Sequence, residues 1–302
     1  LHGSYADLRL GPLGRVRELF FLWEDQRKDV PGRARHLLAV LDRGASAMER
    51  ALGSRLEGRD LLVVGPGQQL LETAYFARRN RVVGIDLDVI PPYPSAVEYL
   101  RMLRVNGGIR TLKTAARKLT GFDRALRREI ERQANTTLPR DLNVVAMDAG
   151  AMTFSDGSFD CVYSHSCFEH LADPEAVMRQ IDRVLRPGGL AHIEVHLYTS
   201  DSGCHDARIF ANRRSSIPPW SHLRPRLRDR VQTNVYLNEL RLDRWRALFE
   251  ACWPETTFDL LPDHDVGRRR ELPAIRAAGE LEAYSDEELL TVDLVAEWVK
   301  PG

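Results

Sequence analysis

The stretch Asp60-Leu-Leu-Val-Val-Gly65-Pro66-Gly67 decides the fold. A short continuous apolar run that ends at a glycine is typical of a strand buried on both faces of a parallel sheet. Four similar runs follow along the chain, at residues 81–86, 142–148, 159–164 and 190–196. Helical patterns separate several of these runs, as at 70–79 and 174–185. Strands that alternate with helices predict an α/β protein with a mostly parallel sheet and helices on both faces.

The rest of the chain extends this core at both ends. Apolar residues recur at helical spacing in two series between residues 15 and 52, so we expect residues 1–56 to be an N-terminal helical segment. After an irregular stretch, the pattern predicts a helix over 240–251, a strand over 257–261 and a last strand over 290–299.

The connection between the second and third predicted strands, residues 87–140, is far longer than a usual crossover of about a dozen residues. Its middle is helical and basic, with Ala115, Leu119, Leu126 and Ile130 on one face. Because such an insertion leaves the carboxyl end of a strand, where ligands bind in these folds, we interpret it as a lid or acceptor platform. A solvated helical decoration and a dimer contact, which would make a homodimer, are the alternatives.

Composition narrows the class of protein. The chain has 43 basic and 43 acidic residues, so bulk nucleic-acid binding is not expected, although local basic patches could meet an anionic substrate. No apolar run is long enough to cross a bilayer, and we expect no membrane association. The four cysteines show neither CxxC pairing nor zinc-ligand spacing, which favours reduced thiols in the cytoplasm.

Two features suggest an adenosine-containing ligand. Glycines directly after a first buried strand, Gly65 and Gly67, let the backbone approach a ligand. Asp86 closes the second strand, where a carboxylate can accept hydrogen bonds from both ribose hydroxyls. Leu70 occupies the place of the third glycine of a dinucleotide fingerprint, and Asp86 could also be a simple turn or helix cap. These two features fit NAD as well as S-adenosylmethionine (SAM).

A third block separates the two ligands. Asp148-Ala149 closes the next strand and is followed by Phe154-Ser-Asp-Gly-Ser-Phe-Asp160, Phe168-Glu-His-Leu171 and Arg183-Val-Leu-Arg-Pro-Gly-Gly189. This order and spacing resembles the large class I SAM-dependent methyltransferase family, of the type that methylates small molecules and glycans. The resemblance implies a Rossmann-like seven-stranded sheet whose last strand is antiparallel, within a methyltransferase domain over residues 57–302. It also implies SAM as cofactor, bound across the first, second and fourth strands, and S-adenosylhomocysteine as product.

The resemblance assigns roles to individual positions. Gly65 and Gly67 would face the methionine part of SAM, Asp86 its ribose and Asp148 its adenine amine, while Ser164 and His165 would line the methyl-transfer site. The implied cofactor-binding residues are Gly65, Gly67, Asp86, Leu87, Asp148, Ala149, Ser164 and His165. The chain departs from the family at Val63, where an acidic residue is usual, and at Gln69, where a third glycine is usual. Both departures concern the methionine end of the pocket.

Transfer to a hydroxyl requires a base, and histidine is the usual one near neutral pH. The candidate catalytic residues are His165, His170, His205 and His222, with His196 nearby. We favour His165 because it directly follows the strand that carries the donor methyl. For His170 we prefer a structural role, in which Glu169 and His170 orient the loop that opens a helix.

Two further expectations concern the acceptor side. Residues 197–236 are predicted to be an acceptor-side loop segment, in which Trp220 either stacks on a sugar or aromatic ring or packs the loop onto the core. A related family of quinone O-methyltransferases holds Mg²⁺ with a Glu-x-x-Glu-His run. Here Ser166 replaces the first Glu, so only Glu169 and His170 match, and we predict no metal site.

The function predicted from the sequence is therefore SAM-dependent methyl transfer to a small molecule or saccharide, at a hydroxyl. One alternative is an RNA or protein methyltransferase, against which stand the neutral net charge and the lack of an appended binding domain. The other is a non-catalytic SAM-binding subunit, which Val63 and Gln69 would motivate. The sequence leaves open the acceptor, the methylated atom and the oligomeric state.

Overall fold

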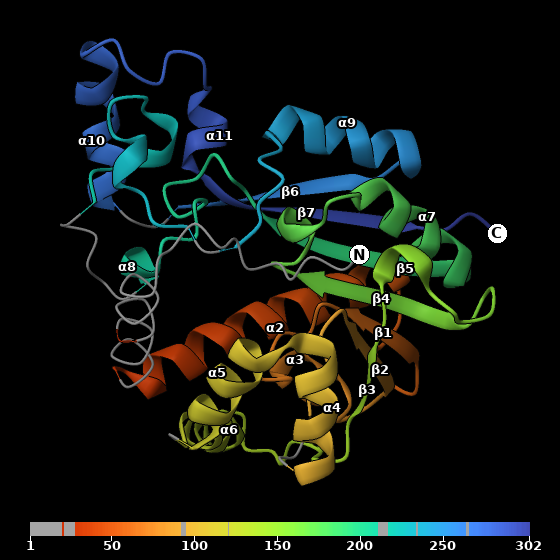
Figure 1. Cartoon of the computed structure of the whole chain (residues 1–302). Coiled ribbons are helices and arrows are strands. Elements are labelled where there is room, and N and C mark those ends of the chain that lie inside the picture. The colour runs from red at the N-terminus through yellow and green to blue at the C-terminus, as the bar shows by residue number, and fades with distance from the viewer. Residues whose placement is uncertain are drawn as a thin grey trace.

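The computed structural model describes Phe20 and residues 28–91, 95–119, 121–210, 217–233, 235–263 and 266–302. These residues form one seven-stranded sheet in the order β3-β2-β1-β4-β5-β7-β6 (Figure 1). The strands are β1 (Asp60–Val64), β2 (Arg81–Asp86), β3 (Asn143–Ala146), β4 (Phe159–His165), β5 (Leu185–His196), β6 (Thr257–Pro262) and β7 (Thr291–Val299). Strands β1 to β5 are parallel, and β7 is antiparallel to both β5 and β6. The predicted Rossmann-like sheet with an antiparallel last strand is confirmed.

Helices cover both faces of the sheet (Figure 1). The α-helices are α2 (Val30–Leu52), α3 (Leu71–Phe76), α4 (Ala96–Asn106), α5 (Gly108–Leu119), α6 (Phe122–Gln133), α7 (Pro174–Val184), α8 (Ala207–Phe210), α9 (Leu242–Cys252), α10 (Val266–Ala277) and α11 (Asp286–Leu290). Short 3-10 helices are η1 (Ala149–Ala151), η2 (Phe168–His170), η4 (Ser221–Leu223) and η5 (Arg228–Arg230). Among the residues described, no helix combines the length and the apolar character needed to cross a membrane.

Strand β1 shows why the apolar run is continuous. Its side chains alternate between two cores: Leu62 and Val64 pack with α7 and α9, whereas Leu61 and Val63 pack with α2, α3 and α6. All four side chains are at most 1% exposed. Burial of such a side chain contributes about 1.5–3 kcal/mol, so the central strand holds both layers together.

Helix α2 begins at the predicted break. Asp29 caps it by accepting a hydrogen bond from the amide of Gly32 at 2.9 Å, and Pro31 lies in its first turn, where a missing N–H is harmless. Farther along, a Cβ at Gly44 would lie 3.0 Å from the Tyr163 ring, so glycine lets α2 approach β4 closely. The first of the two predicted N-terminal helices lies, except for Phe20, outside the described residues.

Helices α4, α5 and α6 occupy the long connection after β2. The side chains of Phe122, Leu126 and Ile130 on α6 are buried against α2 and its neighbours, so this part of the insertion belongs to the core. Arg127 donates hydrogen bonds to the carbonyls of Leu138 and Pro139 and thereby orients the entry to β3. A lid or acceptor role for the segment stays a prediction.

Trp220 belongs to a small separate core formed by η4, α10 and α11, apart from the two cores beside β1. It is fully buried, its amide donates to Asp201 Oδ1 at 2.8 Å, and its indole N–H donates to the Leu289 carbonyl at 3.3 Å. A side chain held in this way packs the loop onto the core and is not available to stack on an acceptor. Of the two interpretations of Trp220, the structure supports packing.

The two-sided burial of β1 predicts a large stability effect. We expect Leu62→Ala to lower the free energy of unfolding by about 2–5 kcal/mol, because a fully buried leucine leaves a cavity in the centre of the sheet. The matched control is Leu112→Ala, since Leu112 is 71% exposed and should change stability by less than about 0.5 kcal/mol. Urea unfolding of the three proteins measures both effects, and equal losses in the two variants would contradict this account of the core.

Candidate functional site

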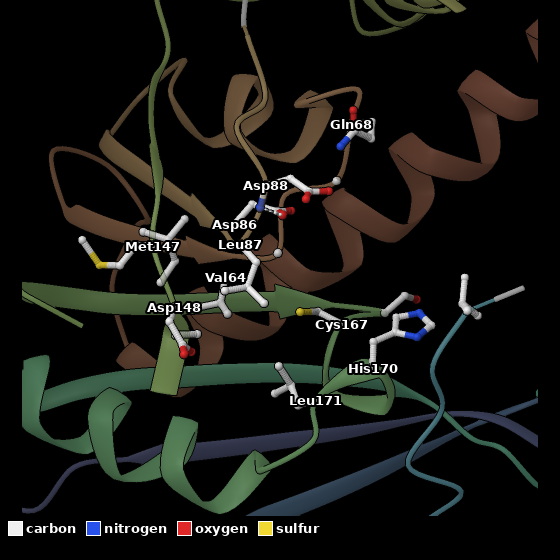
Figure 2. A pocket seen from close by; sticks show the side chains of 16 residues that line it. Val64, Gln68, Asp86, Leu87, Asp88, Met147, Asp148, Cys167, His170 and Leu171 are labelled. Atoms are coloured by element: carbon white, nitrogen blue, oxygen red, sulfur yellow. Dashed lines mark hydrogen bonds between the residues drawn. The ribbon is translucent and has the colours of Figure 1, made fainter. Parts of the chain in front are cut away.

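A pocket lies where β1, β2 and β3 end and the chain leaves β4 (Figure 2). In parallel α/β sheets, ligands bind outside the carboxyl ends of the strands at the point where strand order reverses, here between β1 and β4. The lining residues are Val64, Gly65, Gly67, Gln68, Ile85, Asp86, Leu87, Asp88, Met147, Asp148, Ala149, Ser166, Cys167, His170, Leu171 and Val235. Six of the predicted cofactor residues are therefore brought together, namely Gly65, Gly67, Asp86, Leu87, Asp148 and Ala149.

The turn after β1 keeps its backbone open to the pocket. Gly65 and Gly67 have φ values of 71° and 63°, a left-handed conformation that favours glycine. A Cβ at Gly65 would lie 2.3 Å from the Cys167 sulfur, whereas a Cβ at Gly67 would meet nothing within 4 Å. The first glycine is therefore required by close packing, and the second leaves space for a ligand beside the backbone.

The family's usual third glycine is replaced by a residue that fastens the turn. Gln69 lies 3.4 Å from Asp123 of α6, measured between Nε2 and Oδ1. The adjacent Gln68 accepts a hydrogen bond from Thr114 of α5 at 3.3 Å. These contacts connect the insertion to the glycine turn. Val63 is fully buried and faces the core shared with α2, so its side chain points away from the pocket.

Three carboxylates give the pocket its charge. Asp86 is the last residue of β2, Asp88 lies just after that strand, and Asp148 follows β3 (Figure 2). Asp86 accepts a hydrogen bond from the Asp88 amide at 2.9 Å, and Asp148 accepts one from the Gly150 amide at 2.8 Å. The described lining residues include neither lysine nor arginine. A negatively charged pocket attracts a cationic ligand and repels the pyrophosphate of a dinucleotide.

Ser164 and His165 lie outside the set of described residues that line the pocket. Ser164 is fully buried, and its hydroxyl donates to the Val64 carbonyl at 2.9 Å, which ties β4 to β1. His165 Nδ1 lies 2.9 Å from Glu72, and its Nε2 lies 3.5 Å from Glu194. Glu194 also forms an ion pair with Arg43 of α2 at 3.0 Å. Their predicted cofactor contacts stay untested.

The surroundings of His165 alter its protonation. Burial by itself lowers the pKa of this imidazole, but the hydrogen bond with Glu72 and the negative charges of Glu72 and Glu194 outweigh burial and raise the pKa to about 9. At neutral pH His165 is therefore a cation and has no lone pair with which to accept a proton. The role of His165 as the base stays a prediction, although this arrangement does not favour it; the sequence did not reveal the two carboxylates.

His222 is also removed from the pocket. Its Nε2–H donates to the Tyr198 carbonyl at 2.7 Å, and burial lowers the pKa of the ring to about 4. The imidazole is neutral, but it packs against the Tyr198 ring beside the small core of η4, α10 and α11. His222 is therefore placed to hold the loop after β5.

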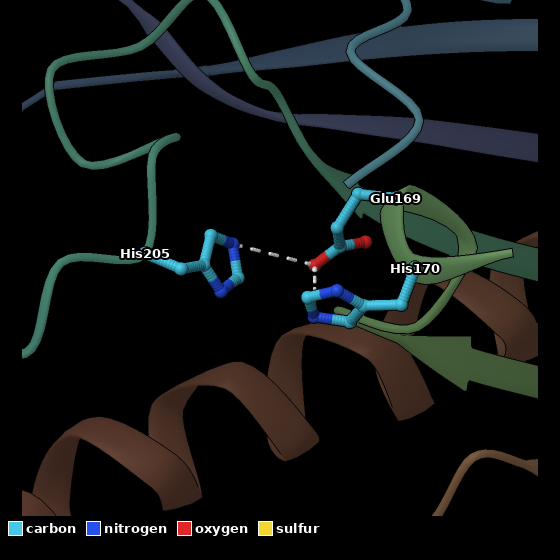
Figure 3. Close-up of side chains that lie close together, drawn as sticks. All are labelled: Glu169, His170 and His205. Atoms are coloured by element: carbon cyan, nitrogen blue, oxygen red, sulfur yellow. Dashed lines mark ion pairs between the residues drawn. The ribbon is translucent and has the colours of Figure 1, made fainter. Parts of the chain in front are cut away.

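Glu169, His170 and His205 come together beside the pocket (Figure 3). Glu169 is 2% exposed, and its Oε1 lies 3.8 Å from His170 Nε2 and 3.9 Å from His205 Nε2. Burial raises the pKa of the Glu169 carboxyl above its usual value. Burial and the neighbouring His196 and His170 lower the pKa of His205 well below its usual value. His170 lines the pocket, so this cluster lies at its edge.

Sequence reasoning paired Glu169 with His170 but did not predict that Glu169 contacts His205. The two residues are brought together by the path of the loop that leaves β5. His205 has φ 53°, and its amide donates to the Ser202 carbonyl at 3.0 Å, which closes a turn that carries the ring back toward η2. The adjacent Glu and His in the sequence were the only available signal.

Comparison with known proteins agrees with the expected family. Residues 105–193 match a family model described as "Methyltransferase domain". The chain is 36% identical over 59 residues to the sterol 4-C-methyltransferase strm-1 of Caenorhabditis elegans, covering 20% of this chain and 18% of that protein. It is 34% identical over 79 residues to ajmaline N-methyltransferase of Rauvolfia serpentina, covering 24% and 27%. The match runs from the end of α4 to most of β5, and its description agrees with the methyltransferase family that the sequence resembles.

Among solved structures, a putative sarcosine dimethylglycine methyltransferase from Galdieria sulphuraria is 16% identical, with a TM-score of 0.46. That alignment covers 87% of this chain and 86% of the other. The curated relatives are matched over much less of their length, since the chain covers between 18% and 31% of them.

The position of Asp86 predicts a specific loss of affinity. We expect Asp86→Ala to weaken binding of S-adenosylhomocysteine about 10- to 100-fold, because hydrogen bonds from ribose hydroxyls to a charged acceptor would be lost. Isothermal calorimetry measures this change. The control is Asp141→Ala. Asp141 is exposed and precedes β3, so it lies at the amino-terminal ends of the strands, away from the pocket. Equal affinities in both variants, or no heat with the wild type, would contradict the assignment.

The raised pKa of His165 predicts a pH-dependent stability. The folded pKa of about 9 lies above the usual 6.5, so the stabilisation is complete below pH 6.5 and is lost as the pH rises through 9. The wild type should therefore be more stable than His165→Gln at pH 6. This advantage in the free energy of unfolding should shrink by on the order of 2 kcal/mol at pH 10. Urea unfolding at both pH values measures this difference, and a difference independent of pH would show that the imidazole is not held as a cation.

Proposed function

We propose that this chain, whose residues 105–193 belong to a methyltransferase domain, transfers the methyl group of SAM to a hydroxyl of a small molecule or saccharide. The observation that carries the proposal is the charge of the pocket. Three aspartates line it at the carboxyl ends of β2 and β3, and its described residues offer no basic side chain for a phosphate. SAM bears a sulfonium and an ammonium, and its carboxylate offsets only one of these charges.

The residues at the strand ends would hold the donor by its polar parts. Asp86 would accept hydrogen bonds from the ribose hydroxyls, and Asp148 would accept one from the adenine amine. The open side of Gly67 would receive the methionine part. Asp88 is 7% exposed and lines the same pocket, and it would be the acidic residue on this side of the pocket that Val63 is not.

Methyl transfer from a sulfonium is an in-line displacement on a carbon already activated by positive charge, so the protein mainly aligns the reactants and excludes water. In this arrangement the pocket floor is apolar, with Val64, Ile85 and Leu171 among its lining residues. The donor would lie between this floor and the carboxylates, which limits access of water to the methyl group.

The acceptor would approach from the side of η2 and the loop after β5. His170 reaches the pocket there, and its Nδ1–H donates to the Tyr236 carbonyl at 2.8 Å. The lone pair of a neutral His170 therefore lies on Nε2. This supports His170, in place of His165, as the group that would take the proton of an acceptor hydroxyl.

The four free cysteines support a cytoplasmic location, since Cys161 and Cys204 are buried and burial raises the pKa of both thiols to about 12. Such thiols behave as small apolar side chains and need no oxidising environment.

Transfer of labelled methyl from SAM tests the proposal. The purified chain is incubated separately with pools of small metabolites, glycans, RNA and protein, and incorporation is counted with Asp86→Ala as the matched variant. We expect label in the small-molecule or glycan pool, reduced at least tenfold by the variant at a subsaturating SAM concentration. Label confined to RNA or protein would overturn the substrate class. Binding of SAM with no labelled pool would favour a non-catalytic subunit.

A further inference from the structure

The cluster at the edge of the pocket contains a buried carboxyl group for which the described residues provide no hydrogen bond. Within the described part of the chain, neither oxygen of the Glu169 carboxylate has a hydrogen-bond partner, although the side chain is 2% exposed. An isolated buried carboxylate is strongly unfavourable unless it is paired or binds a cation. Both nearby imidazoles present Nε2 to the same oxygen, Oε1, at 3.8 and 3.9 Å (Figure 3).

We propose that Glu169, His170 and His205 bind a divalent transition-metal ion. One carboxylate oxygen and two imidazole nitrogens form the donor set, and these atoms lie within 4.8 Å of one another. Ligand atoms around a tetrahedral ion are about 3.4 Å apart. The two Glu–His separations are thus about 0.5 Å longer than in a bound site, and the two imidazole nitrogens, within 4.8 Å, would approach by up to about 1.4 Å through side-chain rotation.

The tautomer of His170 suits a metal ligand. Its Nδ1–H donates to the Tyr236 carbonyl at 2.8 Å, which leaves the lone pair on Nε2, the atom that faces Glu169. A histidine that binds a metal through one nitrogen commonly donates its other N–H to a backbone carbonyl in this way. The hydrogen bond thus orients the ring before any ion arrives.

Asn238, in the segment after residue 235, holds the backbone that carries Glu169 and His170. The Asn238 amide donates to the Glu169 carbonyl at 2.9 Å. The Asn238 side chain donates to the carbonyls of Phe168 at 2.9 Å and Leu171 at 3.1 Å. These hydrogen bonds fix the backbone from which the side chains of Glu169 and His170 extend, as the support around a metal site does.

His205 is held in a conformation that non-glycine residues rarely adopt. Its φ is 53°, and on its carboxyl side Asp206 binds Arg208 and the Gln232 amide. Left-handed backbone in a non-glycine residue is unfavourable by about 1 kcal/mol or more and persists where the surroundings demand it. Here the consequence is that the ring faces Glu169.

His196 does not compete as a fourth ligand. Its Nδ1 lies 2.9 Å from Asp293, and its Nε2 lies 3.0 Å from the Ser202 hydroxyl, so both ring nitrogens are engaged. Its ring packs edge-to-face on His205 with centroids 5.1 Å apart and supports that ligand. The remaining coordination positions would be filled by water or by an oxygen of an acceptor.

The donor set selects the class of ion. Two imidazoles and one carboxylate suit Zn²⁺, Mn²⁺, Fe²⁺ or Co²⁺, whereas Mg²⁺ and Ca²⁺ prefer oxygen ligands. The site therefore differs from the carboxylate-rich magnesium run considered in the sequence analysis, and it depends on His205. A bound ion would lower the pKa of a coordinated hydroxyl, and His170 would then act as a ligand instead of a proton acceptor.

Metal binding can be measured apart from methyl transfer. The full chain is stripped with EDTA, dialysed and titrated with Co²⁺ while the visible absorption is followed, and Zn²⁺ binding is measured by competition. We expect one ion per chain, with binding weakened at least tenfold in Glu169→Gln and in His205→Ala. The matched control is His36→Ala, since His36 is exposed on α2 and should leave binding unchanged.

S-adenosylhomocysteine calorimetry on each stripped variant shows whether it still folds, and His205→Gln replaces His205→Ala if that variant does not. No binding to the wild type, or equal binding to the wild type and both cluster variants, would overturn the site. Loss of ion binding with retained S-adenosylhomocysteine binding in the variants would support it. Because the readout is the ion, a protein that binds metal but transfers no methyl group would contradict only the proposed function.

Discussion

The common direction of β1 to β5 is the constraint on which the site depends. Parallel strands deliver every following loop to the same edge of the sheet, and the reversal of strand order between β1 and β4 leaves a crevice at that edge. The glycine turn, the aspartates after β2 and β3, and η2 after β4 all converge there although they are far apart in the chain. The two apolar cores that pack on either side of β1 therefore also help to set the distance between the pocket residues after β1, β2 and β3 and the histidines after β4.

A chain of alternating charges stabilises this edge beneath the pocket. Arg43, Glu194, His165 and Glu72 follow one another across α2, β5, β4 and α3. The position that made His165 attractive as a base, directly at the end of β4, also places it between two carboxylates. The same proximity that raises its pKa joins four elements of the fold, so His165 is better suited to hold the edge than to exchange protons.

The sequence allowed the strands and six of the residues that line the pocket to be predicted because both depend on local patterns. A buried parallel strand must be apolar throughout, and a turn that a ligand approaches needs glycine. The residues Asp60–Val64 and Gly65 therefore predict their own structure without knowledge of the side chains around them. The roles of His165, Trp220 and Glu169 depend on side chains that lie distant in the sequence. Glu72 is 93 residues from His165, and Leu289 is 69 from Trp220. No local signal reports such contacts, so the sequence could not show the surroundings of these side chains.

The charge of the pocket has a consequence for turnover under the proposed function. The donor carries a net positive charge that the transfer removes, whereas Asp86, Asp88 and Asp148 keep theirs. An electronegative pocket thus binds the donor more strongly than the product, which favours exchange of one for the other after each transfer. The proton of an acceptor hydroxyl would also have to leave, and the His170 imidazole beside Glu169 lines the pocket where an acceptor would approach. Under the two proposals, a cation held there would compensate the charge of Glu169 and oppose the build-up of negative charge on the acceptor oxygen. The buried carboxylate would then have a role in the chemistry.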